Sequence, residues 1–221
     1  MRAAPLSPII LMNLNTPWER VLHLGRPVAF TPKQWICFDQ DDDYLGFYYI
    51  REGRIRLSYI SSTGHEKVLF YIGRGSLFHD VPAVVKSDCV FTCMEPTSAV
   101  YFAKRVISLA FAREYPDLML NWVESTARKS SNFYNQLCGS GLFDAFTNVC
   151  RTLYSMVLYN RENDKVVPHL TSQELAALLG IHRGSLHKAL ARLREEGVIA
   201  SYSRHELVVC DHKKLEAYAL A

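Results

Sequence analysis

Residues 170–190 read LTSQELAALLGIHRGSLHKAL, and this stretch carries the start and end signals of two short helices. Thr171 and Glu174 have the spacing of a capping box, in which each side chain bonds the backbone amide of the other residue. Gly180 suits the end of the first helix, because glycine readily adopts the left-handed conformation found there. A second helix is expected from about Arg183 to Glu196. Two helices joined by a short glycine-containing turn predict a helix-turn-helix.

The segments around this pair of helices predict a small domain. Residues 198–202 and 206–209 alternate apolar and polar side chains on either side of Ser203-Arg204-His205, which indicates a β-hairpin, or wing. Residues 142–159 have the spacing of an amphipathic helix, and residues 160–165 are expected to form a polar loop.

The second helix of the pair offers one basic face. If the leucines at 186, 190 and 193 are buried, the opposite face presents positions 183, 184, 187 and 188. Arg183 suits bidentate contact with guanine, and His187 and Lys188 can donate to bases or phosphates. The alternative is a helical hairpin whose basic face contacts only solvent. The candidate DNA-contacting residues are Thr171, Ser172, Arg183, Gly184, Ser185, His187, Lys188 and Arg204.

The N-terminal half predicts short β-strands. Residues 47–50, 55–60 and 67–72 are rich in β-branched and aromatic side chains, and residues 89–102 give two further runs broken at Glu95-Pro96. Gly53, Gly64 and Gly75 separate these runs at a constant spacing, which suits turns that need positive φ. Many short strands at this spacing predict a sandwich or barrel.

A long helix is expected from Pro116, because proline suits the first turn of a helix. Its side chains recur at intervals of three and four, and the members of the stripe are Met119, Trp122 with Val123, Thr126, Ser130, Phe133 and Leu137. The stripe packs either on its own domain or against a second copy in a parallel dimer seam. Gly139-Ser140-Gly141 is expected to end the helix as a hinge. The predicted domains are therefore 1–115, 116–140 and 141–221, with a shorter helix over 104–114.

Composition limits the class of protein. The chain has 221 residues, 49% hydrophobic and 21% charged, with a net charge of +3, so it is globular rather than disordered. The six cysteines form no CxxC pair, which favours reduced thiols in the cytoplasm. No run approaches the roughly 20 apolar residues of a membrane span. The apolar segment 8–12 is expected to pack on the body of the protein or on a partner subunit.

These motifs resemble the CRP/FNR superfamily of bacterial transcription regulators along nearly the whole chain. The resemblance implies an α+β fold: a cyclic-nucleotide-binding-like β-roll, a dimerisation helix and a C-terminal winged helix-turn-helix. Residues 48–53, Gly64 and residues 75–78 carry it in the β-roll, and residues 170–190 carry it in the helix-turn-helix. Arg183 and Lys188 match two base-reading positions of the family, whereas Gly184 replaces its usual glutamate.

The sensor half departs from the nucleotide-binding members of that superfamily. His79-Asp80 stands where they carry Gly-Glu, and Asp88-Cys89 stands near their Arg-Ser. Residues 66–71 and 94–97 are similar to the halorespiration regulators that sense chlorinated phenols, and Lys129 falls where their dimer helix carries an effector lysine. We therefore expect an aromatic or anionic effector other than cyclic AMP. The candidate contacts are Tyr71, His79, Cys89, Thr126 and Lys129.

The expected protein is a homodimeric transcription regulator that binds palindromic double-stranded DNA and a small molecule, and RNA polymerase if it is an activator. Neither a membrane partner nor a cofactor is expected. One alternative is a haem-based gas sensor with His79 as an axial ligand. A second is a cupin-type metal enzyme, but His65 and Glu66 lack partners at ligand spacing, so catalysis is not predicted.

Overall fold

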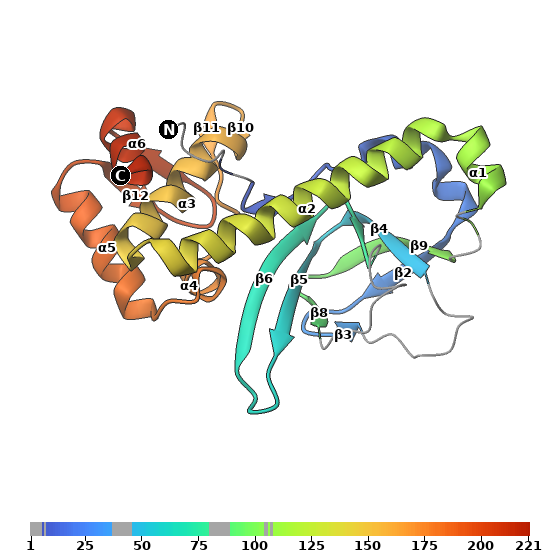
Figure 1. Cartoon of the computed structure of the whole chain (residues 1–221), viewed down its shortest axis with the longest axis horizontal. Helices are drawn as coiled ribbons and strands as arrows, with labels where there is room; N and C mark the ends of the chain where they lie inside the picture. Colours follow the sequence, from blue (N-terminus) through green and yellow to red (C-terminus); the bar gives the residue numbers. More distant parts are fainter. Residues whose placement is uncertain (1–5, 7, 37–45, 80–88, 104–105, 107) are drawn as a thin grey trace. The chain divides into compact units, whose positions relative to one another are not determined.

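The computed structural model describes residue 6 and residues 8–36, 46–79, 89–103, 106 and 108–221 (Figure 1). The chain divides into two compact units, which are considered separately below. One unit comprises residues 10–130, and the other comprises residues 1–9 and 131–221. The division falls inside a helix, α2, which runs from Pro116 to Leu142.

The unit of residues 10–130 contains two β-sheets. The five-stranded sheet has the order β1-β6-β5-β8-β3 and the four-stranded sheet the order β2-β9-β4-β7. The strands of the first are β1 (Ile10–Leu11), β3 (Trp35–Ile36), β5 (Arg54–Ile60), β6 (Glu66–Gly73) and β8 (Cys89–Cys93). Those of the second are β2 (Arg26–Phe30), β4 (Gly46–Glu52), β7 (Leu77–Phe78) and β9 (Thr97–Ala103). Among these pairings only β1–β6 is parallel.

The predicted strands and turns of this unit are confirmed. The aromatic runs at 47–50, 55–60 and 67–72 lie inside β4, β5 and β6. Gly53, Gly64 and Gly75 have φ of 94°, 81° and 72°, as their positions in turns require. Beside the sheets lie a 3-10 helix, η1 (Thr16–Leu24), and α1 (Leu109–Glu114). Residues 104, 105 and 107 of the predicted short helix lie outside the described residues.

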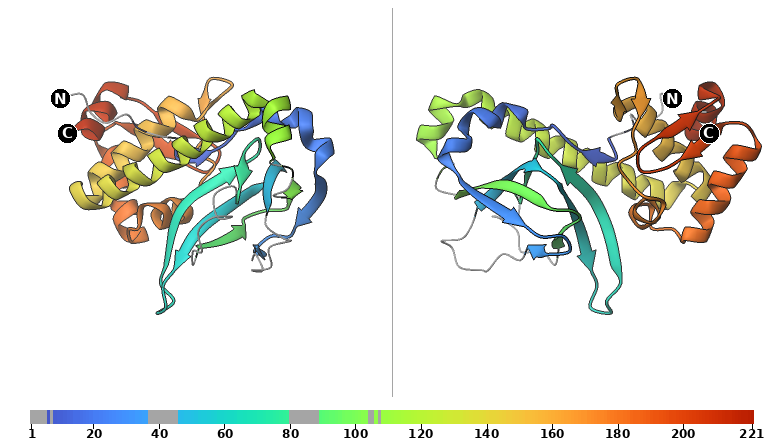
Figure 2. Two further views of the ribbon diagram at one scale, coloured as in Figure 1. Left: turned by 45° about the vertical axis from the view of Figure 1, so that its right-hand side comes forward. Right: turned by 180° about the vertical axis from the view of Figure 1, so that it is seen from behind.

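Two apolar clusters hold this unit together. The first draws side chains from both sheets, among them Leu57, Phe70, Phe78 and Phe91. The second joins the four-stranded sheet to η1, α1 and α2, and its centre is Trp18 against Phe47, Phe102, Phe111 and Trp122. Figure 2 shows from two sides how the strands gather next to the first half of α2. Burial of such aromatic side chains is the main stabilising contribution to a unit of this kind.

The expected hinge at Gly139-Ser140-Gly141 is not a helix end, because α2 continues to Leu142. Gly139 accepts a hydrogen bond at its carbonyl from Asn148 Nδ2 at 2.6 Å. A Cβ atom at position 139 would lie 2.9 Å from Asn148 Oδ1. The glycine therefore permits close packing of the next helix rather than a break.

The second unit is a winged helical domain. Its helices are α3 (Ala145–Tyr159), α4 (Ser172–Leu179), α5 (Arg183–Glu195) and α6 (His212–Leu220). Its strands are β10 (Arg161–Glu162), β11 (Lys165–Val166), β12 (Ile199–Tyr202) and β13 (Leu207–Val209), in the order β10-β11-β13-β12. The wing is confirmed as β12–β13. The loop expected over 160–165 is instead a hairpin, since Asn163 and Asp164 both adopt positive φ and form a tight turn between two strands.

Candidate DNA interface and effector region

The predicted capping box and C-terminal glycine of α4 are both present in the structure. Thr171 N donates to Glu174 Oε2 at 2.8 Å, and Glu174 N donates to Thr171 Oγ1 at 3.2 Å. Gly180 ends α4 with φ of 68°. Thr171 is exposed, and Ser172 is half-buried at the first position of the helix. The capping box thus fixes where α4 starts and the glycine fixes the turn into α5.

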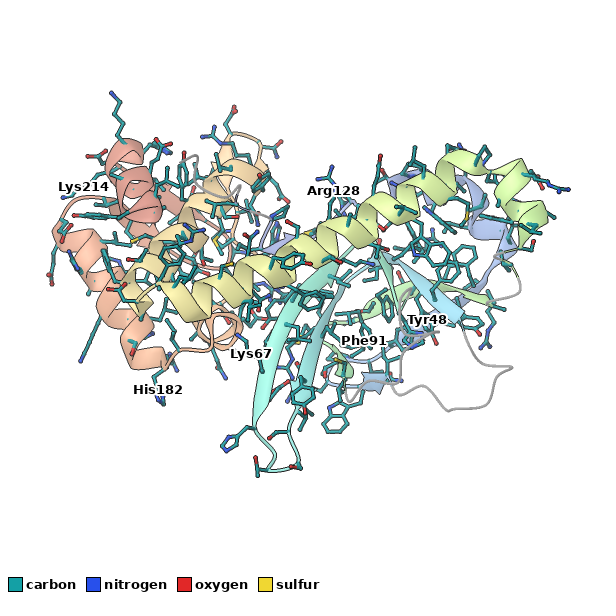
Figure 3. All side chains as sticks on the ribbon, in the orientation of Figure 1. Tyr48, Lys67, Phe91, Arg128, His182 and Lys214 are labelled. Carbon is teal, nitrogen blue, oxygen red and sulfur yellow. The ribbon has the colours of Figure 1, made fainter. Side chains whose placement is uncertain are left out.

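Helix α5 has the two faces that the sequence predicts. Leu186, Leu190 and Leu193 are buried, and Arg183, Gly184, His187 and Lys188 are exposed. Ser185 is half-buried between the two faces. The first turn of α5 carries no acidic residue, so the partial positive charge of the helix N-terminus stays uncompensated within that turn. His182, which caps α5, projects from this end of the helix (Figure 3).

Arg183 and His187 contact each other across one helical turn. Arg183 Nε donates to His187 Nε2 at 3.4 Å, a long hydrogen bond that the neutral imidazole accepts. Next to Arg183 in the sequence, Gly184 is exposed, and a Cβ atom there would meet nothing within 4 Å apart from the neighbouring residues. An unhindered guanidinium at the start of a helix is suited to contact a base edge in the major groove.

The wing is braced at its tip. Ser203 Oγ accepts from His205 N at 3.2 Å and from Glu206 N at 3.0 Å. Arg204 lies half-buried at this tip, and its carbonyl accepts from His169 N at 2.9 Å. Lys165 on β11 pairs with Glu206 at 3.2 Å. The additional hairpin β10–β11 therefore supports the wing, a feature that sequence reasoning missed.

A charged cluster anchors the C-terminal end of α5. Glu196 accepts hydrogen bonds from Tyr218 Oη and, at 2.8 Å, from Arg192 Nε, and Lys214 Nζ lies 3.4 Å from it. These contacts, led by the Tyr218 hydrogen bond, lower the pKa of Glu196 from 4.5 to about 2. The Arg192 guanidinium also lies 4.0 Å from the ring centroid of Phe146 on α3. The cluster joins α5 to α3 and α6 behind the exposed basic face.

Three expected effector residues are fixed inside the β-sheet unit. Lys129 is 4% exposed, and its Nζ donates to the carbonyl oxygen of Leu77 at 2.8 Å. His79, also buried, has Nδ1 2.7 Å from the carbonyl oxygen of Gly46, and its ring meets Phe91 edge to face. Tyr71 is fully buried, with the guanidinium of Arg54 5.4 Å from its ring centroid.

Lys129 and His79 converge on β7, because Leu77 is two residues before His79. Thr126 and Cys89 are half-buried and lie on α2 and β8. Asp80 and Asp88, which matter for the comparison with nucleotide-binding proteins, lie outside the described residues.

The expected dimer residues do not share one exposed face. Trp122 stacks on Phe47 with ring centroids 5.4 Å apart, and Met119 packs against the same cluster. These two half-buried residues therefore pack on the core of their own unit, which is the first of the two alternatives, and their place in a dimer interface stays a prediction. Thr126 is half-buried, and Phe133 and Leu137 are exposed.

A different stripe of α2 is exposed and apolar. Leu120, Val123, Tyr134 and Leu137 are 60%, 65%, 70% and 71% exposed. Together with the exposed Ala127 and Ser130, they recur at alternating intervals of three and four along the helix. The stripe predicted from the sequence shares Val123, Ser130 and Leu137 with this exposed stripe. It missed the other members because the buried face of α2 has nearly the same spacing.

Other candidate chemistry is sparse in the described part of the chain. Burial raises the pKa of Cys93 to about 11 and that of Cys150 to about 12, whereas Cys138 and Cys210 are exposed. Among the described residues, no three His, Cys, Asp or Glu side chains are grouped to hold a metal ion. No helix among them has the length and apolarity to cross a membrane.

Comparison with known protein families identifies the C-terminal domain. Residues 148–218 match the model of the Crp-like helix-turn-helix domain, which spans α4, α5 and the wing. The match shows that the C-terminal part of the chain carries a Crp-like helix-turn-helix domain, a type of domain that places a recognition helix in the major groove of DNA. A search of curated protein sequences finds no match.

Solved structures share the fold at low sequence identity. A CprK variant complexed with OCPA is 19% identical, with a TM-score of 0.79 over 97% of this chain and 99% of that one. A CooA variant from Carboxydothermus hydrogenoformans is 18% identical, with a TM-score of 0.78 over 94% and 99%. FixK2 from Bradyrhizobium japonicum is 15% identical, with a TM-score of 0.74 over 89% and 98%.

Proposed function

We propose that this chain is a homodimeric, sequence-specific transcription regulator whose DNA affinity is controlled by a small-molecule effector other than cyclic AMP. The observation that carries the proposal is the exposed basic face of α5, with Arg183, His187 and Lys188 within its first two turns. That face lies in a Crp-like helix-turn-helix domain, beside a braced wing. Phosphate contacts from such a face give affinity, and base-edge contacts give specificity.

The proposed dimer forms through the exposed apolar stripe of α2, defined by Leu120, Val123, Ala127, Ser130, Tyr134 and Leu137. A stripe with alternating three- and four-residue spacing is self-complementary in a parallel pair of helices. Small side chains at 127 and 130 allow the two helices to approach closely at the middle of the stripe. A two-fold dimer requires a palindromic operator, because each recognition helix reads one half-site.

The proposed effector is a small aromatic or anionic compound bound in the β-sheet unit beside β7. Lys129 reaches Leu77 of β7, and His79 directly follows that strand. CprK, which shares the fold, is described in complex with o-chlorophenolacetic acid, an aromatic carboxylate. Effector binding regulates DNA affinity only if it favours one of two dimer arrangements over the other. If the regulator is an activator, RNA polymerase is a further proposed partner.

The proposal is tested with the purified chain and a random-sequence DNA library. We expect light scattering to show a dimer and selection to yield a two-fold symmetric site. Binding to that site is then measured with o-chlorophenolacetic acid, with cyclic AMP and without either. A dimer that enriches no sequence would refute sequence-specific binding. Tighter DNA binding with micromolar cyclic AMP would refute the effector class, and a Soret band in the purified protein would support the haem-based alternative.

A further inference from the structure

Gly184 is the second residue of α5, and the described part of the fold does not require a glycine there. It is not among the glycines with positive φ. A Cβ atom at this position would meet nothing within 4 Å apart from the neighbouring residues and the backbone of its own helix. Glycine is a poor helix former, so alanine would favour the helix more. The missing side chain therefore costs helix stability without improving the packing of the chain.

The other glycines show which structural requirements are absent at Gly184. One group has positive φ, which other residues rarely adopt, and comprises Gly53, Gly64, Gly75, Gly180 and Gly197. In a second group a Cβ atom would lie within 3.0 Å of another residue, and its members are Gly25, Gly46, Gly73 and Gly139. Only Gly141 shares the freedom of Gly184, but it is the last residue but one of α2, where a helix end frays.

The surroundings of Gly184 suggest what the missing side chain makes room for. Arg183 precedes it, and His187 and Lys188 follow at the three- and four-residue spacings that share its side of the helix. All four positions are exposed. The basic face of α5 thus consists of three long side chains around one position without a side chain, and at that position the helix backbone itself forms the surface.

The dimensions of DNA make this position sensitive. An α-helix with its side chains is about 10–12 Å across, and the major groove of B-DNA is about 12 Å wide. A recognition helix therefore fills the groove, and the side chains on its contacting face set how close its backbone comes to the base edges. A hydrogen bond from an arginine to a base forms only within about 3 Å. A small outward shift of the helix start would break it.

We propose that Gly184 is a positioning residue for DNA recognition: its missing side chain lets the start of α5 approach the base edges closely enough for Arg183 to reach its base pair. This inference rests on the proposed function, and it names double-stranded DNA as the group that fills the open space beside Gly184. A methyl group at position 184 would stand between the helix backbone and the DNA and would hold Arg183 away from its base.

The experiment compares stability with DNA binding in the full-length Gly184→Ala protein. We expect its melting temperature to equal or exceed that of the unmodified protein. Its affinity for the selected operator should fall about five- to a hundredfold, the range that one overpacked methyl group costs at a close-packed contact. Fluorescence anisotropy on single-base variants of the operator should show a relaxed preference at the base pair where Arg183→Ala also relaxes it. Gly141→Ala, the same substitution at the other unconstrained helical glycine, is the control and should leave operator affinity unchanged.

The outcomes separate positioning on DNA from a role in the fold. Retained stability with weaker and less selective binding supports the proposal, because a purely structural glycine would lower stability and binding together. Unchanged operator affinity in Gly184→Ala overturns it and leaves the proposed function intact. A protein that unfolds more easily, an equal loss on random DNA, or an equal loss in Gly141→Ala overturns it as well. If the unmodified chain enriches no sequence, the proposed function and this inference fail together.

Discussion

The side chains of Lys129 and Asn15 form hydrogen bonds with the backbone carbonyl and the backbone amide of Leu77. Lys129 Nζ donates to the Leu77 carbonyl at 2.8 Å, and Leu77 N donates to Asn15 Oδ1 at 2.9 Å. Asn15 also donates through Nδ2 to Asn121 Oδ1 on α2 at 2.9 Å. The position of β7 is therefore tied to α2 at two places, directly by Lys129 and indirectly through Asn121. A displacement of β7 would therefore alter hydrogen bonds that this strand shares with α2.

Replacing Lys129 tests how much its bond stabilises the fold. Lys129→Met keeps most of the apolar side chain but removes the donor, which leaves the buried Leu77 carbonyl without this partner. We expect the free energy of unfolding in urea to fall by about 1–3 kcal/mol. Arg128→Met, at an exposed neighbouring position, is the control and should change it little. An increase in stability would mean that burial of the ammonium group costs more than its contacts return.

The exposed stripe of α2 predicts a monomeric variant. Val123→Asp places a carboxylate in the proposed seam, where two copies would bring like charges together and bury them. We expect light scattering to give the monomer mass, while circular dichroism stays unchanged because Val123 is 65% exposed in the single chain. Arg128→Asp, which introduces an aspartate outside the stripe and changes the charge by even more, should leave the dimer intact. A dimeric Val123→Asp protein would place the interface on another surface.

The helix-turn-helix was predictable because its signals are local. Thr171, Glu174 and Gly180 act through bonds and backbone angles within a few residues, so their types and spacing were sufficient. The hairpin at 161–166 carried a comparable signal in Asn163-Asp164, but the polar composition of the segment favoured a loop.

The orientation of α2 could not be read from its sequence. Leu118 and Trp122 on one face, and Leu120 and Val123 on the other, have equally good helical spacing. Contacts with distant aromatic residues such as Trp18 decide which face is buried. The hydrogen bonds of Lys129 and Asn132 could not be predicted from the sequence either, because these side chains donate to backbone carbonyls 52 and 124 residues away.

The cluster around Glu196 predicts a stability contribution that is lost at low pH. The pKa of Glu196 is lowered from 4.5 to about 2 by Tyr218, Arg192 and Lys214. A depressed pKa stabilises the folded state above the unfolded value and stops doing so as pH falls through the folded value. The free energy of unfolding of the unmodified protein should therefore exceed that of Glu196→Gln at pH 6, and the difference should shrink between pH 4.5 and 2. A difference that is constant over this interval would show that the carboxylate charge contributes nothing.

Arg183 is expected to read one base pair of each half-site. Arg183→Ala removes the guanidinium at the exposed start of α5, and we expect a loss of about 1–3 kcal/mol per half-site on the selected operator. The preference at one position of the half-site should also relax. Fluorescence anisotropy on the operator and on its single-base variants measures both effects. An equal loss on the operator and on random DNA would make Arg183 a phosphate contact.

Two neighbouring substitutions separate base reading from attraction to phosphates. Lys188→Ala, if it removes a phosphate contact, should weaken binding uniformly across sequences. It should also reduce the slope of the logarithm of the binding constant against the logarithm of salt concentration by about one per half-site. His187→Ala removes the acceptor 3.4 Å from Arg183 Nε, so its effect should be smaller when Arg183 is already alanine. Measuring the variant with both substitutions completes the double-mutant cycle. Additive losses from positions 183 and 187 would show that the hydrogen bond between them does not position the arginine on DNA.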